Sequence, residues 1–114
     1  MLLVLFNSGC DYCQGKAKIF KMKKERFKDL KVYWISSEPQ AEIQAFYKAY
    51  KFENLDFQFL EDREGFQYTE FNVSSTPTIM QFSPQGTFVR EFPDDAPVGY
   101  ILDQILKGEQ ADTQ

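Results

Sequence analysis

Apolar positions along the chain follow two different periods. Residues 2–6 and 31–36 are almost continuously apolar, a pattern typical of strands that are covered on both faces of a sheet. Residues 10–30 and 37–50 instead repeat apolar side chains every three to four positions, which predicts two helices. Strands that alternate with helices favour parallel pairing through right-handed crossovers. The first half of the chain therefore predicts the order β-α-β-α.

The second half of the chain predicts a strand, a short helix, a hairpin and a final helix. The expected elements are a strand at 57–60, a helix at 66–71, strands at 78–82 and 87–92, and a helix at 97–107. Ser83-Pro84-Gln85-Gly86 joins the last two strands, and Pro followed by Gly in so short a connection favours a hairpin. Gly108 is expected to end the final helix. The whole order predicts an α/β fold with a mixed sheet, a C-terminal β-hairpin and helices on both faces.

Two details of the helices follow from side-chain chemistry. The apolar residues of the 10–30 helix fall near one stripe, which favours packing against the sheet; they are Ala17, Phe20, Phe27 and Leu30. The next helix is expected to begin with Ser37 as its N-cap residue. Gln40 stands at capping-box spacing from Ser37, and Pro39 fits the first turn.

Composition indicates one folded domain. The chain has 114 residues, of which 43% are hydrophobic and 17% aromatic, so it can build a core and is too apolar to be disordered. We expect a domain at 1–108 and a polar tail at 109–114. No apolar run approaches the ~20 residues of a membrane span, and residues 2–6 are too short for the core of a signal peptide. The prediction is a soluble chain, or a soluble domain cut from a longer exported or anchored protein.

The net charge of −4 hides a basic segment. Residues 16–31 carry eight basic and two acidic side chains, whereas the rest of the chain is acidic. A basic helix on an acidic body could attract nucleic acid or anionic lipid. The lysines are spread around the helix and are not paired with exposed aromatic residues. We therefore interpret them as a solvated helix face and expect no nucleic-acid partner.

The chemistry of the chain is concentrated in Cys10-Asp11-Tyr12-Cys13, which contains its only two cysteines. The pair follows the first apolar run and opens the first helix. Free N–H groups and a partial positive charge at a helix start favour a thiolate over a thiol. Residues three apart in a helical turn are close enough for a disulfide. We therefore predict a redox pair, in which the exposed Cys10 attacks and the deeper Cys13 resolves the mixed disulfide.

Three other interpretations of the pair are weaker. A structural disulfide would close a four-residue loop and would constrain the unfolded chain little. A zinc site needs four nitrogen or sulfur ligands, which one chain with two cysteines and no histidine cannot supply. Two inert thiols at a helix start are the third. We expect no metal, and no cofactor beyond the dithiol itself.

The order of elements and two motifs resemble the thioredoxin superfamily over nearly the whole chain, from Leu3 to Leu106. The first motif is Phe6-Asn7-Ser8-Gly9-Cys10-Asp11-Tyr12-Cys13. The second is Phe71-Asn72-Val73-Ser74-Ser75-Thr76-Pro77-Thr78, followed by Phe82-Ser83-Pro84-Gln85-Gly86. The second motif is most similar to the TlpA/ResA-type branch of exported thiol–disulfide oxidoreductases. The resemblance implies a thioredoxin-like three-layer sandwich.

The resemblance also implies roles for individual residues. Pro77 matches the cis proline that the family places opposite the cysteine pair, although an ordinary turn proline is the alternative. Thr76 would offer its backbone groups to a substrate chain. The residues expected to contact substrate are Gly9, Asp11, Tyr12, Thr76 and Pro77.

Four positions depart from the family's pattern. Gly9 stands where many members have Trp, and Tyr12 where many have Pro. Thioredoxins bury an Asp at the position of Val4, and the TlpA/ResA branch often has a Glu at the position of Lys16. The usual proton acceptor for Cys13 is therefore missing from both positions.

The sequence favours a thiol–disulfide oxidoreductase that acts on protein disulfides and has an upstream thiol electron donor. We expect a monomer without a membrane span, and the resemblance favours a periplasmic or exported location over a cytoplasmic one. A peroxiredoxin-like peroxidase is the enzymatic alternative, although neither a T-x-x-C setting nor a nearby arginine is evident around Cys10. A non-catalytic binding domain with the same fold is the other alternative, because the usual proton acceptor is missing.

Overall fold

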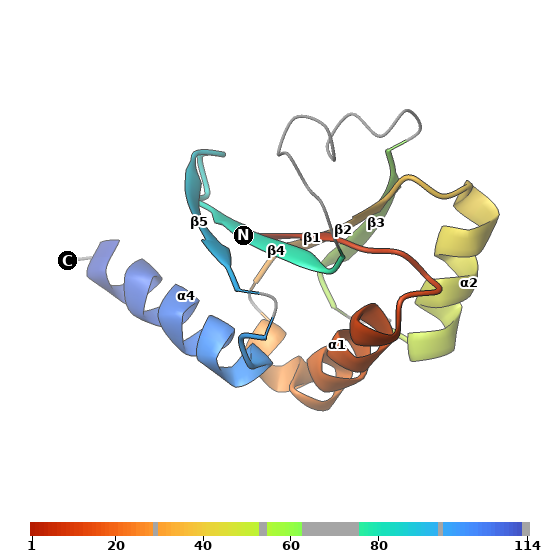
Figure 1. Ribbon diagram of the computed structural model, residues 1–114. Helices are drawn as coiled ribbons and strands as arrows, with labels where there is room; N and C mark the ends of the chain where they lie inside the picture. Colours follow the sequence, from red (N-terminus) through yellow and green to blue (C-terminus); the bar gives the residue numbers. More distant parts are fainter. Residues whose placement is uncertain (29, 53–54, 63–75, 94, 113–114) are drawn as a thin grey trace.

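The computed structural model (Figure 1) describes residues 1–28, 30–52, 55–62, 76–93 and 95–112, with side chains described as far as Leu106. Its elements are β1 (Leu2–Leu5), α1 (Asp11–Met22), the 3-10 helix η1 (Lys24–Phe27), β2 (Val32–Ser36), α2 (Gln40–Tyr50), β3 (Phe57–Glu61), β4 (Thr78–Phe82), β5 (Phe88–Phe92) and α4 (Val98–Asp112). The five predicted strands are present, and each end lies within one residue of its expected position. The helix predicted at 66–71 lies outside the described residues.

The strands form one mixed sheet in the order β3-β2-β1-β4-β5. β1 and β3 both pair in parallel with β2, as expected for strands joined by crossover helices. β4 runs antiparallel to β1. It also runs antiparallel to β5, and β4 and β5 together form the predicted hairpin. In its turn Gly86 has a φ of 91°, a conformation that glycine adopts without steric cost. The predicted α/β class, mixed sheet and C-terminal hairpin are confirmed.

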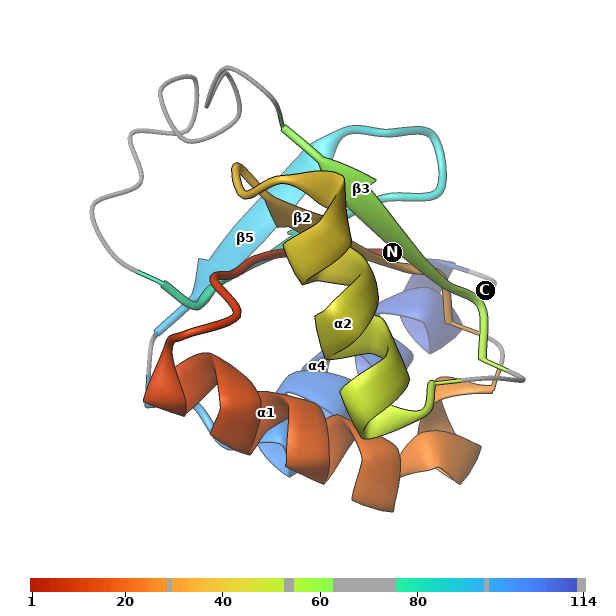
Figure 2. The same ribbon diagram turned by 90° about the vertical axis from the view of Figure 1, so that its right-hand side faces the viewer.

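The main core lies between the sheet and the helices α1, α2 and α4, which all pack on the same face (Figures 1 and 2). Trp34 of β2 is fully buried there, with its ring stacked on Phe59 at 5.5 Å and edge-on to Phe6 at 5.6 Å between centroids. Phe20 of α1 contacts the Trp34 ring at 5.1 Å and stacks on Phe27 at 4.5 Å. Burial of each such side chain stabilises the fold by about 1.5–3 kcal/mol. This packing holds α1, and with it the cysteine pair, against the sheet.

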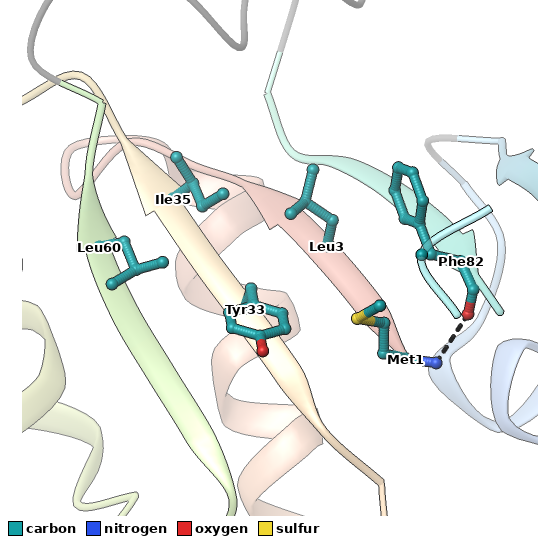
Figure 3. A pocket seen from close by; sticks show the side chains of 7 residues that line it. Met1, Leu3, Tyr33, Ile35, Leu60 and Phe82 are labelled. Carbon is teal, nitrogen blue, oxygen red and sulfur yellow. Dashed lines mark hydrogen bonds between the residues drawn. The ribbon is translucent and has the colours of Figure 1, made fainter. Parts of the chain in front are cut away.

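The opposite face of the sheet carries a smaller apolar cluster around Leu5, Ile35 and Met80. An open pocket of about 370 Å³ lies on this face (Figure 3), and the N-terminal amine of Met1 donates a hydrogen bond to the Phe82 carbonyl at its rim (2.8 Å). The pocket is lined by Met1, Leu3, Tyr33, Ile35, Leu60, Phe82 and Gly86. Helices were predicted on both faces of the sheet. All the described helices lie on the other face, so the described residues include no helix that covers this face.

The helix predicted at 10–30 is interrupted at Lys23. α1 ends at Met22, and the backbone of Lys23 (φ −102°, ψ 24°) leads into η1. Residues 21–26 contain four basic side chains, and like charges at helical spacing destabilise a helix. The tighter 3-10 turn, which is common at helix ends, keeps Phe27 stacked on Phe20.

The predicted capping box of the second helix is wrong. α2 begins with Pro39 as its N-cap residue, and no side-chain hydrogen bond caps this end. Ser37 is exposed, and it is the hydroxyl of Ser36 that accepts a hydrogen bond from the Glu38 N–H, at 3.1 Å. Because Pro39 has no N–H, the start of α2 has one donor fewer to satisfy.

The predicted end of the last helix is also wrong, because α4 continues past Gly108 to Asp112. A glycine inside a helix costs only about 1 kcal/mol relative to alanine. Glu, Gln and Ala follow it at positions 109–111, and all three favour helix. Most of the segment predicted as a polar tail therefore continues the helix.

Candidate functional site

The loop between β1 and α1 delivers Cys10 to the start of a helix. Asn7 follows the strand, and its Oδ1 accepts a hydrogen bond from the Gly9 N–H at 2.9 Å. The Asn7 carbonyl accepts a second bond, from the Cys10 N–H at 3.1 Å. Asn favours such a turn because its short side chain can bond to the backbone two residues further on. Cys10 then has the extended backbone (φ −84°, ψ 119°) of an N-cap residue.

The Cys10 sulfur occupies the position that a serine or aspartate oxygen often has at an N-cap. It accepts a hydrogen bond from the Cys13 N–H at 3.1 Å, and as a thiol it donates one to the Thr76 carbonyl at 3.5 Å. Partial burial raises the pKa of Cys10, but hydrogen bonds from the Cys13 side chain, the Cys13 N–H and the Thr76 side chain lower this pKa by more, so that it lies below its ordinary value of 9.0. Cys10 is therefore the thiol of the pair that ionises more readily.

Cys13 lies one helical turn further on and is fully buried. Burial, and then the hydrogen bond to Cys10, raise the pKa of Cys13 to about 12. A Cys13 thiol that donates to the Cys10 sulfur stabilises the Cys10 thiolate and at the same time holds its own proton more firmly. Both cysteines are free thiols in this structure. Their surroundings thus separate two chemically identical groups into an accessible, acidic thiol and a buried, protonated one.

Thr76 and Pro77 reach the cysteine pair because β4 runs antiparallel to β1. The register pairs Leu5 with Thr78, so the end of β1 and the beginning of β4 meet at one edge of the sheet. Pro77 is buried, and the Thr76–Pro77 peptide bond is cis. Thr76, the first described residue of the second motif, therefore contacts Cys10 of the first motif, although the two residues are 66 positions apart along the chain.

Gly9, Asp11 and Tyr12 form an exposed rim around Cys10. The Tyr12 side chain is 80% exposed, and Gly9 and Asp11 are exposed on either side of the nucleophile. A large aromatic side chain with so little cover is available to a partner. All three residues are accessible to a docked chain, and their contacts with substrate stay a prediction.

Neither family position for a buried acid provides a carboxylate. Val4 is fully buried and packs in the main core. Lys16, one turn beyond Cys13, donates from Nζ to the carbonyl of Ala96 in the loop before α4 (2.5 Å). A proton that leaves Cys13 therefore finds no side-chain base at either position.

The sequence interpretation missed the residues that hold the loop before Cys10. The Glu38 carboxylate accepts hydrogen bonds from the Ser8 N–H (2.8 Å), the Ser8 hydroxyl (2.6 Å) and the Ser36 hydroxyl (2.7 Å). The Gln14 side chain donates to the Ser8 carbonyl at 2.8 Å. One signal could have revealed Glu38. It follows the second strand by two residues, and the carboxyl ends of neighbouring parallel strands lie at the same edge of a sheet.

Comparison with protein-family models and with the sequences of curated proteins gives no match. Comparison with solved structures does. The exposed lipoprotein thioredoxin of Streptococcus pneumoniae is 22% identical, with a TM-score of 0.72 over 93% of this chain and 82% of its own. A secreted disulfide oxidoreductase of Mycobacterium tuberculosis, homologous to DsbE of E. coli, is 21% identical, with a TM-score of 0.66 over 91% of this chain and 75% of its own. The chain has the thioredoxin fold.

Proteins with the thioredoxin fold and a different chemistry match as well. A cysteine-to-serine mutant of peroxiredoxin Q from Xanthomonas campestris has a TM-score of 0.73 at 14% identity, over 99% of this chain and 78% of its own. Because disulfide oxidoreductases and a peroxiredoxin share this fold, the fold alone does not select the reaction. The choice between them depends on the geometry around Cys10. Within the part of the chain that the structure describes, no helix is long and apolar enough to cross a membrane.

Proposed function

We propose that the protein is a thiol–disulfide oxidoreductase that exchanges disulfides with protein substrates through Cys10 and Cys13. The observation that carries the proposal is the asymmetry of the pair. Cys10 is accessible and has a lowered pKa, whereas Cys13 is buried and its pKa is raised to about 12. Thiolates attack disulfides and thiols do not, so this asymmetry assigns the first attack to Cys10.

The exchange takes place in two displacements. The Cys10 thiolate attacks one sulfur of a substrate disulfide, the substrate S–S bond breaks, and the departing sulfur leaves as a thiolate that takes a proton from solvent. Cys13 then gives up its proton to solvent and attacks the Cys10 sulfur. The mixed disulfide breaks, the second substrate sulfur leaves as a thiolate, and a Cys10–Cys13 disulfide forms. Two electrons pass from the dithiol to the substrate, and the reverse sequence oxidises a substrate dithiol.

The mixed disulfide itself makes Cys13 easier to ionise. The hydrogen bond to Cys10 and the Cys10 charge both raise the pKa of Cys13 in the free dithiol. Once Cys10 is bound to substrate its sulfur is neutral, so both of these contributions weaken and burial remains. The second displacement therefore starts from a more acidic Cys13 than the free protein contains.

Substrate docking is assigned to the Thr76 backbone and to the rim of Gly9, Asp11 and Tyr12. An extended peptide that pairs with backbone groups gains affinity whatever its side chains are. The Thr76 carbonyl lies 3.5 Å from the Cys10 sulfur, so a chain held there would carry its disulfide to the nucleophile. Pro77 ends the docking segment and leads into β4.

The test is equilibration of the reduced protein in glutathione buffers of graded potential, followed by reduction of insulin disulfides with dithiothreitol. Wild type should form a Cys10–Cys13 disulfide at a defined potential and accelerate insulin reduction. Cys10→Ser should abolish the acceleration. Cys13→Ser should accumulate a mixed disulfide on Cys10, because the resolving thiol is missing.

The alternatives predict other outcomes. A binding domain would leave the pair unchanged across the glutathione series and would accelerate no exchange, a result that rejects the enzyme. A peroxidase would consume hydrogen peroxide faster than it exchanges disulfides. The two described arginines lie elsewhere: Arg26 bonds to Asp103, and Arg90 bonds to Gln104. We therefore expect peroxide consumption no faster than that of an ordinary thiol of similar pKa.

A further inference from the structure

Glu38 joins two loops at the carboxyl ends of β1 and β2. Both of its carboxylate oxygens accept hydrogen bonds from Ser8: Oε1 from the N–H at 2.8 Å, and Oε2 from the hydroxyl at 2.6 Å. Oε1 also accepts a bond from the Ser36 hydroxyl at 2.7 Å. Ser36 is fully buried at the end of β2 and accepts in turn from the Glu38 N–H. The carboxylate is thus anchored to a strand and reaches across to the loop that precedes Cys10.

The Glu38 carboxylate is ionised at neutral pH. Partial burial raises its pKa, but the hydrogen bonds from Ser8 and Ser36 lower it by more, so the pKa of Glu38 lies below its ordinary value. Hydrogen bonds to an ionised acceptor are shorter and roughly twice as strong as neutral ones. Three such bonds converge on a partly buried group, so the carboxylate holds the loop firmly.

Ser8 is held from its other side as well. Its carbonyl accepts a hydrogen bond from the Gln14 side chain of α1 at 2.8 Å. The N–H, hydroxyl and carbonyl of Ser8 are therefore all bonded, two residues before the nucleophile. The position of Ser8 determines where the chain enters α1, and hence how the Cys10 sulfur lies over the Cys13 N–H.

We propose that Glu38 is a positioning residue for Cys10, which through Ser8 holds the nucleophile in the N-cap geometry that stabilises its thiolate. The proposal deepens the function proposed above and rests on it for its biological meaning. Glu38 takes no part in bond making or breaking. Its contribution is to keep the sulfur within hydrogen-bond distance of the first turn of α1.

Positioning and charge have opposite effects on Cys10, which makes the proposal testable. A negative charge nearby opposes formation of a thiolate, so removal of a carboxylate that acted through its charge alone would make Cys10 more acidic. Removal of a carboxylate that positions the loop would weaken the hydrogen bond from Cys13 and make Cys10 less acidic. The sign of the change therefore distinguishes the two roles.

The experiment measures the rate of Cys10 alkylation by iodoacetamide as a function of pH in the reduced protein. Glu38→Ala should shift the profile to higher pH and slow alkylation at pH 6 by about three- to tenfold, because one weakened hydrogen bond to a charged group has about that effect on ionisation. Glu38→Gln keeps an oxygen for the Ser8 N–H and the Ser36 hydroxyl, and should react faster than Glu38→Ala. Glu42→Ala, which removes an exposed carboxylate from the first turn of α2, is the matched control and should titrate as wild type.

Other outcomes overturn the proposal. They are an unchanged or more acidic Cys10 in Glu38→Ala, and equal profiles for the Ala and Gln variants. A lower melting temperature with an unchanged alkylation profile would show a purely structural role. If Glu38→Ala does not fold, Glu38→Gln and Ser8→Ala replace it, singly and combined. Non-additive effects on the Cys10 profile support action through Ser8, and additive effects reject it.

The same measurements separate this proposal from the proposed function. Alkylation reports only the thiolate of Cys10 and needs no substrate protein. A shifted profile in a protein that exchanges no disulfides would retain the positioning role and reject the oxidoreductase. Full exchange activity with an unshifted alkylation profile would retain the oxidoreductase and reject the positioning role of Glu38.

Discussion

The structure predicts a large difference in reactivity between the two cysteines of the reduced protein. The perturbation is brief treatment with iodoacetamide at pH 7. An ordinary thiol with a pKa of 9.0 is about 1% thiolate at that pH, and Cys10, whose pKa is lower, exceeds this fraction. Cys13, with a pKa of about 12, is ~0.001% thiolate. Cys10 should therefore react at least about 1000-fold faster, and the full burial of Cys13 increases the difference.

The pH dependence follows from the same values. The midpoint of the Cys10 rate profile should lie below pH 9, because the pKa of Cys10 is lowered from its ordinary value. The Cys13 rate should continue to rise about tenfold per pH unit beyond pH 9, because a raised pKa keeps it protonated up to about 12. Above pH 9 the reduced protein should also lose stability that Cys13→Ala retains. A group whose pKa is raised by folding stabilises the folded state fully at a pH below its unfolded-state pKa. This stabilisation is lost as the pH rises through its folded-state pKa.

Mass spectrometry provides the assay. Both cysteines fall in the tryptic peptide 1–16, so fragment ions show which sulfur carries the label. Alkylation in concentrated urea is the control, and there the two sites should react at rates within a few-fold of each other. Labelling of Cys13 in the folded protein within tenfold of the Cys10 rate would refute the reasoning, and preferential labelling of Cys13 would reverse the assigned roles.

Two further predictions concern the fold. Phe20→Ala should lower the free energy of unfolding, measured in urea, by about 3–5 kcal/mol, because it removes a fully buried ring. Met22→Ala, at a side chain that is 82% exposed, should change this free energy by less than about 0.5 kcal/mol. Equal losses would contradict the assignment of the core. Gly86→Ala should destabilise because its φ of 91° strains any residue with a Cβ, and Gly15→Ala should stabilise by up to about 1 kcal/mol because it lies inside α1 with no atom within 4 Å of the added carbon; the same sign for both would be inconsistent with these backbone conformations.

The strands were the most predictable part of the fold. Continuous apolar runs and a Pro-Gly turn depend on local sequence, and the structure has β1, β2 and the β4–β5 hairpin where these signals predicted them. Helix ends depended on contacts that the sequence does not display. The break at Lys23 keeps Phe27 on Phe20, and α2 begins at Gln40 after Pro39, with Ser36 and Glu38 bonded to each other just before it.

The candidate site divides in the same way. The spacing of Cys10 and Cys13 placed both at a helix start, and the resemblance to the thioredoxin superfamily indicated Thr76, which contacts Cys10. Glu38 was not predicted, because its role depends on the parallel pairing of β1 with β2. A carboxylate that binds a loop 30 residues earlier in the chain has no local sequence signal.

The contact between Cys10 and Thr76 makes thiol reactivity a measure of folding order. The N-cap bond from Cys13 is local and can form with α1 alone. The Thr76 contact closes a separation of 66 residues and requires β4 to have paired with β1, the kind of non-local event that is slow in folding. In a chain with α1 formed and the sheet incomplete, the Cys10 sulfur would already cap the helix. It would not yet contact Thr76. Pulse alkylation during refolding would therefore distinguish chains in which Cys10 contacts Thr76 from chains in which it does not. The change in alkylation rate would report when β4 pairs with β1.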